Sequence, residues 1–507
     1  MKKQIVNPYL PFNVCEPDGE PHVFGDRVYV YGSHDEEGGN RFCKLNYEFY
    51  SAPVDDLTSW SSRGISYDKT NDPDYSEPGR FPDMYAPDVV KGNDGRYYLY
   101  YALSGGMYYG KLKSFTDHIH VAVSEKPDGP FRYHGCVRNA DGTPYDRNIT
   151  FDPGVINDDG VIRLYYGWAI DPYVKELNNA FMQKLQKPIF RIMAKVMIGK
   201  TKKQLKSEPL GINGAFTVTL ADDMLTVTSE PKMVAPSRTD AIGTPWEKHG
   251  FFEASSIRKI GDTYYFIYSS EAQHELCYAT SKYPDKDFTY GGVIISNGDI
   301  GYQGRKEKDK LAIIGNNHGS IEKINGKWYV FYHRQTHKTS YSRQGCAEEI
   351  QILPDGSIPQ VEMTSCGLNG GPLVAKGCYN ATIACNLTNG KMPHTERARR
   401  RKDIPYITNT GEERYITNIQ NGTLVGYKYF AFTGETTLVL NVKCKGTGIF
   451  DVYTDEELMG SIEFHDCNVW TSKELSFKTE GRRALYFRFK GSGMAELLEF
   501  SFKSCRR

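Results

Sequence analysis

The chain of 507 residues carries no net charge, because 62 Lys and Arg residues balance 62 Asp and Glu residues. A general binder of nucleic acid or of anionic membranes would need a basic excess. No run of about 18 apolar residues occurs, and polar residues follow Met1-Lys2-Lys3 where a signal peptide would place an apolar segment. We therefore expect a cytoplasmic protein without a nucleic-acid or membrane partner.

The sequence also lacks any pattern of paired cysteines. The 11 cysteines are scattered, odd in number and never in CxxC spacing, which argues against a zinc site and against a disulfide framework. Hydrophobic residues make up 39% of the chain and charged residues 24%, so a packed globular core is expected. The 36 tyrosines favour β-strands and offer flat surfaces that stack on sugars or bases.

A tight turn followed by an aromatic, alternating strand occurs five times along the chain. Successive copies lie roughly 65 residues apart, with one longer interval, and this scale fits four-stranded propeller blades with long loops. The sequence therefore predicts an all-β fold whose first domain, residues 1–360, is a five-bladed β-propeller. The five turns are Gly25-Asp26, Asp94-Gly95, Asp159-Gly160, Gly261-Asp262 and Asn325-Gly326.

The longer interval contains a helical insertion at about residues 171–206, where apolar residues recur at helical spacing opposite a basic face. A membrane-surface helix fits this pattern, and so does a helical hairpin packed on the propeller or at an oligomer interface. We favour the packed hairpin. Short alternating strands with glycine turns follow the propeller and predict a β-sandwich domain over residues 372–507.

Chemically active side chains recur at one place in the repeat. Six to eight residues before each turn stand Asp18, Asp88, Asp152, Glu253 and, in the fifth copy, His318. The innermost strands of a propeller run beside the central channel, so these five positions should converge on one axis. Carboxylates that share a pocket shift each other's pKa and leave at least one protonated near neutrality, as acid/base chemistry requires.

The motifs PDGEPHVF, YAPDVV, FDPGV, FFEAS, NNHGS and SRQGC, in this order, resemble those of the family-43 glycoside hydrolases. The resemblance implies a five-bladed propeller that hydrolyses arabinose- and xylose-containing polysaccharides with inversion. It also implies that Asp18 is the general base that activates water and that Glu253 is the general acid. Asp152 is similar to the carboxylate that orients the acid and tunes its pKa. Inversion needs two carboxyl groups roughly 6.5–9.5 Å apart.

The same resemblance implies residues that bind the sugar. Asp88, His34 and Arg343 are similar to positions that hydrogen-bond sugar hydroxyls, and Phe252, beside the acid, is suited to form an apolar wall. His318 matches the histidine that in many members faces a bound calcium ion in the channel through water. Such a calcium ion is structural or electrostatic and prefers oxygen ligands, so no cofactor is required for the chemistry.

Two features depart from the usual motifs of the family. The first motif reads PDGE where many relatives have Asp-Pro, and Tyr85 replaces the Trp that usually precedes Ala-Pro-Asp. Tyr85 and Trp168 stand beside the proposed site residues, where either a sugar-binding or a core role fits. The C-terminal domain resembles a carbohydrate-binding module through NIQNGTLVGYKYFAFTG, and packing on the propeller is the alternative role.

The leading interpretation is an exo-acting, inverting β-xylosidase or α-L-arabinofuranosidase that trims oligosaccharides, with the homo-oligomeric state left open. A retaining enzyme of the fructan- and sucrose-cleaving type, with Asp18 as nucleophile, is an alternative. Those enzymes usually carry Asn-Asp-Pro-Asn-Gly and Glu-Cys, whereas Pro17-Asp18-Gly19 and Glu253-Ala254 stand here. A non-catalytic sugar-binding propeller is the third interpretation, and it would require one of the three acids to be missing.

Overall fold

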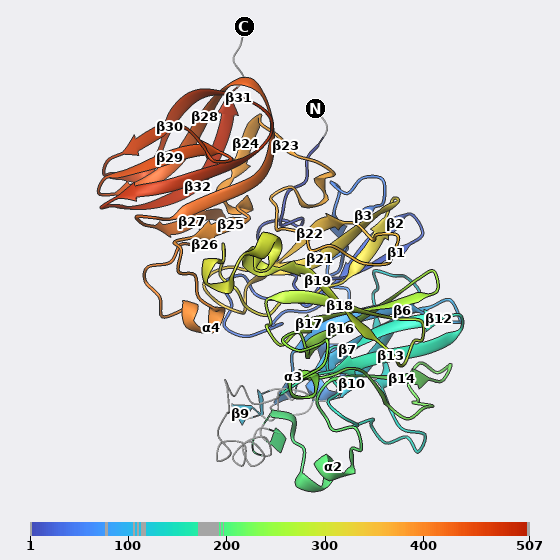
Figure 1. Ribbon diagram of the computed structural model, residues 1–507. Coiled ribbons are helices and arrows are strands. Elements are labelled where there is room, and N and C mark those ends of the chain that lie inside the picture. The colour runs from blue at the N-terminus through green and yellow to red at the C-terminus, as the bar shows by residue number, and fades with distance from the viewer. Residues whose placement is uncertain are drawn as a thin grey trace.

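The computed structural model describes residues 3–76, 80–104, 107–108, 111–112, 118–170, 192, 194–195 and 197–503. Roughly its first two thirds consist of antiparallel sheets arranged in sequence order, and its last part is one large sheet (Figure 1). The strands of the first four sheets are β1 Glu20–Phe24, β2 Arg27–Tyr31, β3 Tyr50–Pro53, β4 Ser61–Ser62; β6 Met84–Lys91, β7 Tyr97–Leu103, β10 Ile119–Ser124, β11 Arg132–Cys136; β12 Gly154–Asp158, β13 Val161–Gly167, β14 Ala215–Leu220, β15 Lys232–Ala235; and β16 Phe251–Ile260, β17 Thr263–Ser270, β18 Glu275–Ser281, β19 Thr289–Ser296.

These sheets and a fifth one are the blades of the predicted five-bladed propeller. Each of the five predicted turns joins the first two strands of a blade, with registers such as Glu20↔Tyr31 and Ile321↔Val330. Gly326 has a φ of 83° in its turn, a conformation that side chains disfavour, which explains glycine there. The fifth blade comprises β20 Ile321–Ile324, β21 Lys327–Gln335 and β22 Arg343–Ile350, and a small extra sheet comprises β5 Arg80–Phe81, β8 Met107–Tyr108 and β9 Lys111–Leu112.

The fifth blade has three strands in the described part of the chain instead of the expected four. The N-terminal segment lies along its outer strand instead: the Tyr9 amide donates to the Gly345 carbonyl at 3.3 Å, and the Asn7 side chain donates to the Ala347 carbonyl at 2.9 Å. At the axis, β1 also contacts β20. The first and last parts of the propeller are therefore joined, which closes the ring.

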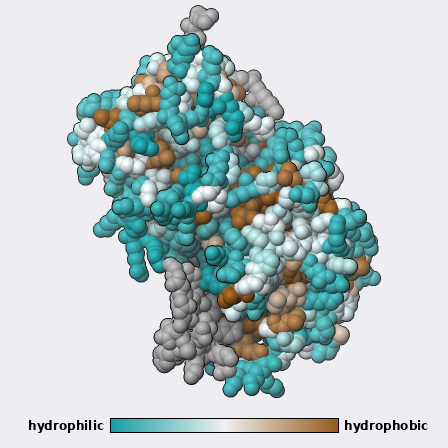
Figure 2. Space-filling model, viewed as in Figure 1, coloured by the Kyte–Doolittle hydropathy of each residue, from teal (hydrophilic) through white to brown (hydrophobic). Residues whose placement is uncertain are grey.

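Apolar residues pack between adjacent blades. Most of the largest fully buried side chains are tyrosines of the blade strands, among them Tyr98, Tyr100 and Tyr166 in the cluster between the second and third blades. The tyrosine excess thus mainly serves the architecture. Figure 2 shows hydrophilic residues over most of the visible face of both parts of the molecule.

Of the predicted helical insertion, residues 171–191, 193 and 196 lie outside the described residues. Near its end, Ala194 is fully buried in a cluster with Phe151 and Ile170, and Met197 packs against that cluster. This part of the insertion packs on the propeller, as the favoured interpretation expects. The described helices are α2 Lys202–Ser207, α3 Arg238–Ala241, α4 Thr395–Ala398 and the 3-10 helices Lys69–Asn71, Pro73–Ser76, Asn297–Asp299, Tyr302–Gly304, Glu307–Asp309, Gly367–Asn369 and Ala381–Ile383; none of them has the length and apolarity to cross a membrane.

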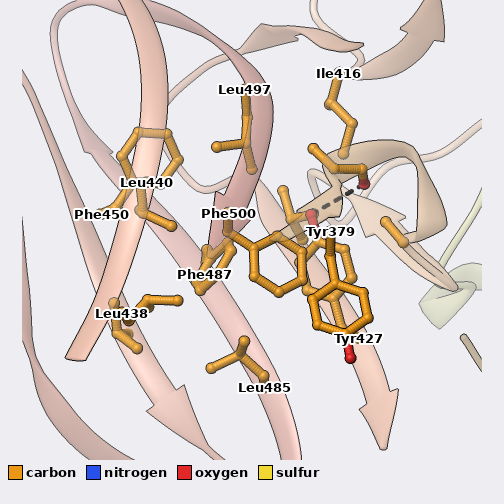
Figure 3. Packing of buried hydrophobic residues seen from close by; sticks show 14 of the residues in the cluster. Tyr379, Ile416, Tyr427, Leu438, Leu440, Phe450, Leu485, Phe487, Leu497 and Phe500 are labelled. Atoms are coloured by element: carbon orange, nitrogen blue, oxygen red, sulfur yellow. Dashed lines mark hydrogen bonds between the residues drawn. The ribbon is translucent and has the colours of Figure 1, made fainter. Parts of the chain in front are cut away.

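The C-terminal part is a ten-stranded sheet that closes around its own aromatic core (Figure 3). Two runs that read as separate strands, 473–478 and 484–491, form one 25-residue strand, β31. The turn-like Gly481 between them has a φ of 84°, and it lies within the strand opposite Phe432. The strands are β23 Leu373–Val374, β24 Gly377–Asn380, β25 Asn386–Thr388, β26 Tyr406–Thr410, β27 Glu413–Ile419, β28 Leu424–Lys445, β29 Gly448–Thr454, β30 Glu457–Phe464, β31 Cys467–Gly491 and β32 Met494–Lys503.

Candidate active site

A cavity of about 240 Å³ opens where the inner strands of the blades begin, and six predicted site residues line it: Asp18, Asp152, Phe252, Glu253, His318 and Arg343. Asp18 precedes β1, Asp152 precedes β12, Glu253 lies at the start of β16 and His318 precedes β20. The repeat therefore brings these side chains together as the sequence predicts, because equivalent positions in a propeller converge on its axis.

The backbone beneath these side chains departs from regular strand geometry. Asp18 and Asp152 have φ values of 60° and 43°, and Ala254, which follows Glu253, has a φ of 70°. The pairing of β16 with β17 shifts register on both sides of Glu253, so the strand bulges there. Left-handed conformations are unfavourable for residues other than glycine and cluster at functional sites. Here they occur at or next to the three carboxylates that line the cavity.

Asp18 is buried among positively polarised groups. The Arg343 Nη1 donates to Asp18 Oδ1 at 2.8 Å, and the Asp18 amide donates to Nδ1 of His333 at 3.3 Å. Burial by itself would raise the pKa of Asp18, but Arg343 and the neighbouring His318 and His333 outweigh it and hold that pKa below its ordinary value. Asp18 is therefore a carboxylate at neutral pH.

Arg343 reaches Asp18 because a second carboxylate holds its other side. Its Nε donates to Asp35 Oδ2 at 2.8 Å and its Nη2 donates to Asp35 Oδ1 at 3.1 Å. The guanidinium also lies 4.9 Å from the centre of the Phe42 ring. Arg343 lines the cavity, as expected for a substrate-binding residue, but most of its donors are used by Asp18 and Asp35.

Glu253 and Asp152 form a pair of buried acids. Burial, followed by the charge of Asp18, raises the pKa of Glu253 to about 8. Burial, Glu253 and Asp18 also raise the pKa of Asp152 well above its ordinary value. Asp152 Oδ2 accepts a hydrogen bond from the Ala254 amide at 3.0 Å, which ties Asp152 to the residue after Glu253. Like charges in one pocket cannot all ionise, so this pair retains a proton near neutrality.

Four aromatic side chains line the cavity, namely Tyr85, Phe151, Trp168 and Phe252. The Phe151 ring contacts two of them, with ring centres 5.5 Å from Tyr85 and 5.3 Å from Trp168. Phe252 lies next to Glu253, as the sequence predicts for an apolar subsite wall. The cavity thus joins carboxyl groups of opposite pKa shift to aromatic faces of the kind that pack on pyranose and furanose rings.

Comparison with known proteins decides the family. Residues 7–224 match the family described as glycosyl hydrolases family 43. A xylosidase/arabinosidase of Thermoclostridium stercorarium is 43% identical over 517 residues, covering 99% of this chain and 99% of that protein. The chain belongs to glycosyl hydrolase family 43. It is accordingly a glycosidase, an enzyme that hydrolyses O-glycosyl bonds.

More distant relatives match about two thirds of the chain. A xylosidase/arabinosidase of Bacteroides ovatus is 29% identical over 363 residues, which cover 68% of this chain and 94% of that protein. A family-43 enzyme of Xanthomonas citri, solved in complex with xylose, superposes with a TM-score of 0.50 at 22% identity, covering 71% of this chain and 94% of that one. This superposition supports the propeller fold.

Two of the predicted sugar-binding residues in this glycoside hydrolase are not among the residues that line the cavity. Asp88 instead contacts the inner strands of other blades: His22 Nε2 on β1 lies 2.6 Å from its Oδ1, and the Val155 amide of β12 donates to its Oδ2 at 2.6 Å. The pairing of β6 with β7 shifts register between Tyr85 and Asp88. The His34 Nδ1 donates to the Asn46 carbonyl at 2.9 Å, within its own loop.

His318 lines the cavity between two of the acids. Its Nδ1 lies 3.6 Å from Asp152 Oδ2 and 3.9 Å from Asp18 Oδ1, and burial lowers the pKa of His318 to about 4. A calcium ion takes six to eight oxygen ligands. Among the described residues, His318 is in none of the clusters of three or more candidate metal ligands. The residues around His318 therefore do not fit a directly coordinated calcium ion.

Several residues that line or support the site have no counterpart in the sequence prediction. Asp35 directly follows His34 and is the residue of that pair that takes part in the site, through Arg343. His333 lies on β21 and was not predicted, because it follows a run of apolar and aromatic strand residues. The polar residues that end the strand KWYVFYHRQ are a signal that could have identified it. Other cavity-lining residues come from segments with no repeat pattern, namely loops and helix α4, and these segments gave no signal in the sequence: Phe42, Gln273, Asn316, Ser340, His394 and Glu396.

Proposed function

We propose that this family-43 enzyme is an inverting, exo-acting glycosidase that removes terminal xylose or arabinofuranose from oligosaccharides. The observation that carries the proposal is the opposite shift of two carboxyl groups in one cavity. The pKa of Asp18 lies below its ordinary value, while the pKa of Glu253 is raised to about 8. At neutral pH one group accepts a proton and the other donates one, which single-displacement hydrolysis requires.

In the proposed reaction, Asp18 takes a proton from a water molecule as the water attacks the anomeric carbon. Glu253 gives its proton to the glycosidic oxygen, so the leaving sugar departs as a neutral alcohol. Arg343 keeps Asp18 ionised and oriented through its 2.8 Å contact. Asp152 accepts a hydrogen bond from the Ala254 amide and so fixes the backbone next to Glu253. The charges of Asp152 and Glu253 repel each other, which keeps a proton on the pair. No metal or organic cofactor takes part in these steps.

The size of the cavity supports exo action. A volume of about 240 Å³ suits a single sugar unit and part of the next, and side chains from blade loops and from the second domain surround it. The preference for pentoses is supported by the relative of 43% identity, which is named a xylosidase/arabinosidase and aligns over 99% of both chains. A cytoplasmic site of action on short oligosaccharides and a structural, water-bound calcium ion remain predictions from the sequence.

The test is a panel of 4-nitrophenyl glycosides followed by NMR of the first-formed sugar. We expect release of nitrophenol from the β-D-xyloside, the α-L-arabinofuranoside or both, with little release from hexosides. NMR on the accepted substrate should show the anomer of opposite configuration first. Failure to cleave either pentoside would overturn the substrate assignment. Net retention would overturn inversion and favour Asp18 as a nucleophile.

A further inference from the structure

The mouth of the catalytic cavity is completed by the second domain. His394 and Glu396 line the cavity together with the catalytic acids, although they precede β26 and belong to the segment that enters the ten-stranded sheet. Figure 1 shows the orange segment that carries α4 extending from this sheet toward the propeller. We define residues 392–398 as the rim segment.

The rim segment is held firmly against the propeller. The Thr395 amide donates to the Ile314 carbonyl at 2.8 Å, and the Ser340 hydroxyl donates to Thr395 Oγ1 at 2.7 Å. Beneath these bonds, Met392 and Ala398 are buried in a cluster with Ile313. Backbone hydrogen bonds and apolar burial together fix the position of the segment. Its cavity-facing side chains are therefore preorganised.

The rim segment lies on the side of the cavity where Glu253, the proposed general acid, is located. His394 Nε2 lies 3.1 Å from Oε1 of Gln273, while its Nδ1 accepts from the Glu396 amide, so Nε2 is the donor to Gln273. Gln273 lies in the turn between β17 and β18, and Glu253 lies on β16 of the same blade, paired with Ser269. A general acid faces the leaving group, so the leaving sugar lies on this side.

Glu396 offers an uncommitted acceptor there. It is an exposed residue that lines the cavity, and within the described residues its carboxylate makes no hydrogen bond and no ion pair. Sugar hydroxyls are donors, and a hydrogen bond to a charged group is stronger than one between neutral groups. Building on the proposed function, we propose that Glu396, beside His394, binds a hydroxyl of the leaving sugar and so selects oligosaccharides over substrates with a non-sugar leaving group.

The experiment measures kcat/KM of each variant on two substrates, the disaccharide and the 4-nitrophenyl glycoside of the same terminal sugar. Glu396→Ala should lower kcat/KM on the disaccharide by about ten-fold or more, the range of a lost hydrogen bond to a charged group. On the nitrophenyl glycoside, which has no leaving-group hydroxyls, kcat/KM of Glu396→Ala should stay within about two-fold of the wild-type value. Glu396→Gln, which keeps a hydrogen-bond acceptor, should fall between wild type and Glu396→Ala on the disaccharide.

Glu456→Ala is the matched control, because Glu456 is an exposed glutamate in the turn between β29 and β30 of the same domain. This variant should leave kcat/KM unchanged on both substrates. Equal losses on both substrates, or no loss on the disaccharide, would overturn the role of Glu396 and leave the proposed function standing. If the panel instead identifies a sugar other than a pentose, the substrate assignment fails, and the same ratio measured with that sugar still decides the role of Glu396.

Discussion

The axis of the propeller and the core of the C-terminal sheet differ in what they bury. Both are built from antiparallel strands, yet the sheet encloses aromatic and aliphatic residues such as Phe430, Phe487 and Phe500, all less than 2% exposed. The propeller buries its apolar residues between blades and leaves the axis to Asp18, Arg343 and other polar groups. In a ring of sheets, the apolar core lies between the sheet faces and the central axis is not part of it. Polar side chains can therefore cluster at the axis without weakening the core.

The largest effect is expected at the axis. Glu253→Ala and Asp18→Asn should each lower kcat/KM by about 10²- to 10⁴-fold, the range of a lost general acid or base. Initial rates on the accepted nitrophenyl pentoside measure this loss. For Glu253→Ala, the loss should be smaller when the leaving group is more acidic, because such a group needs less protonation. Thermal melting checks that each variant is folded, and activity within ten-fold of wild type would contradict the assignment.

A change in the C-terminal core should have the opposite signature. Phe500 is 1% exposed and contacts the rings of Tyr427, Tyr379 and Phe487. Phe500→Ala should lower the free energy of unfolding by about 3–5 kcal/mol through lost burial and the cavity left behind. Urea denaturation followed by circular dichroism measures it. The kcat of the folded variant should be unchanged, and a large loss of kcat without loss of stability would contradict the separation of the two regions.

The pH dependence sharpens the account of the axis. Glu253 must be protonated to act, so kcat/KM should fall as the pH rises through its pKa of about 8. Asp18 must be ionised, so kcat/KM should also fall at a pH below its depressed pKa. Arg343→Lys should weaken the contact with Asp18, raise its pKa and move the acidic limb to higher pH, while the basic limb moves less. A pH–rate profile with a fixed acidic limb would contradict this role of Arg343.

The smallest effect on catalysis is expected at Asp88. Asp88 contacts His22 and the Val155 amide instead of the cavity, so Asp88→Asn should change KM by less than about two-fold and lower the free energy of unfolding by about 1 kcal/mol. Steady-state kinetics and chemical denaturation measure the two effects. A large rise in KM without loss of stability would show that Asp88 binds sugar after all. Phe252→Ala, which removes a cavity wall, should raise KM and is the comparison variant.

Repetition in the sequence explains how much of the site could be predicted. Five turns at similar intervals identify the blades, and the polar residues before them identify Asp18, Asp152, Glu253 and His318 as neighbours, because a propeller places equivalent positions on one axis. The repeat also places Asp88 beside the inner strands of other blades, where it contacts His22 and Val155. It did not predict that Asp88 would be absent from the lining of the cavity.

The sequence by itself determined the all-β fold, the five blades and the acids at their axis. These features follow from repeated turns and alternating strands, which depend on the conformational preferences of residues close together in the chain. Only the tertiary structure decided that Asp35 and His333 support the base, that β31 is one strand, and that the rim segment brings Glu396 to the cavity. These contacts join residues up to hundreds of positions apart through irregular loops. No repeat or alternation encodes them, because they depend on how whole sheets and domains pack.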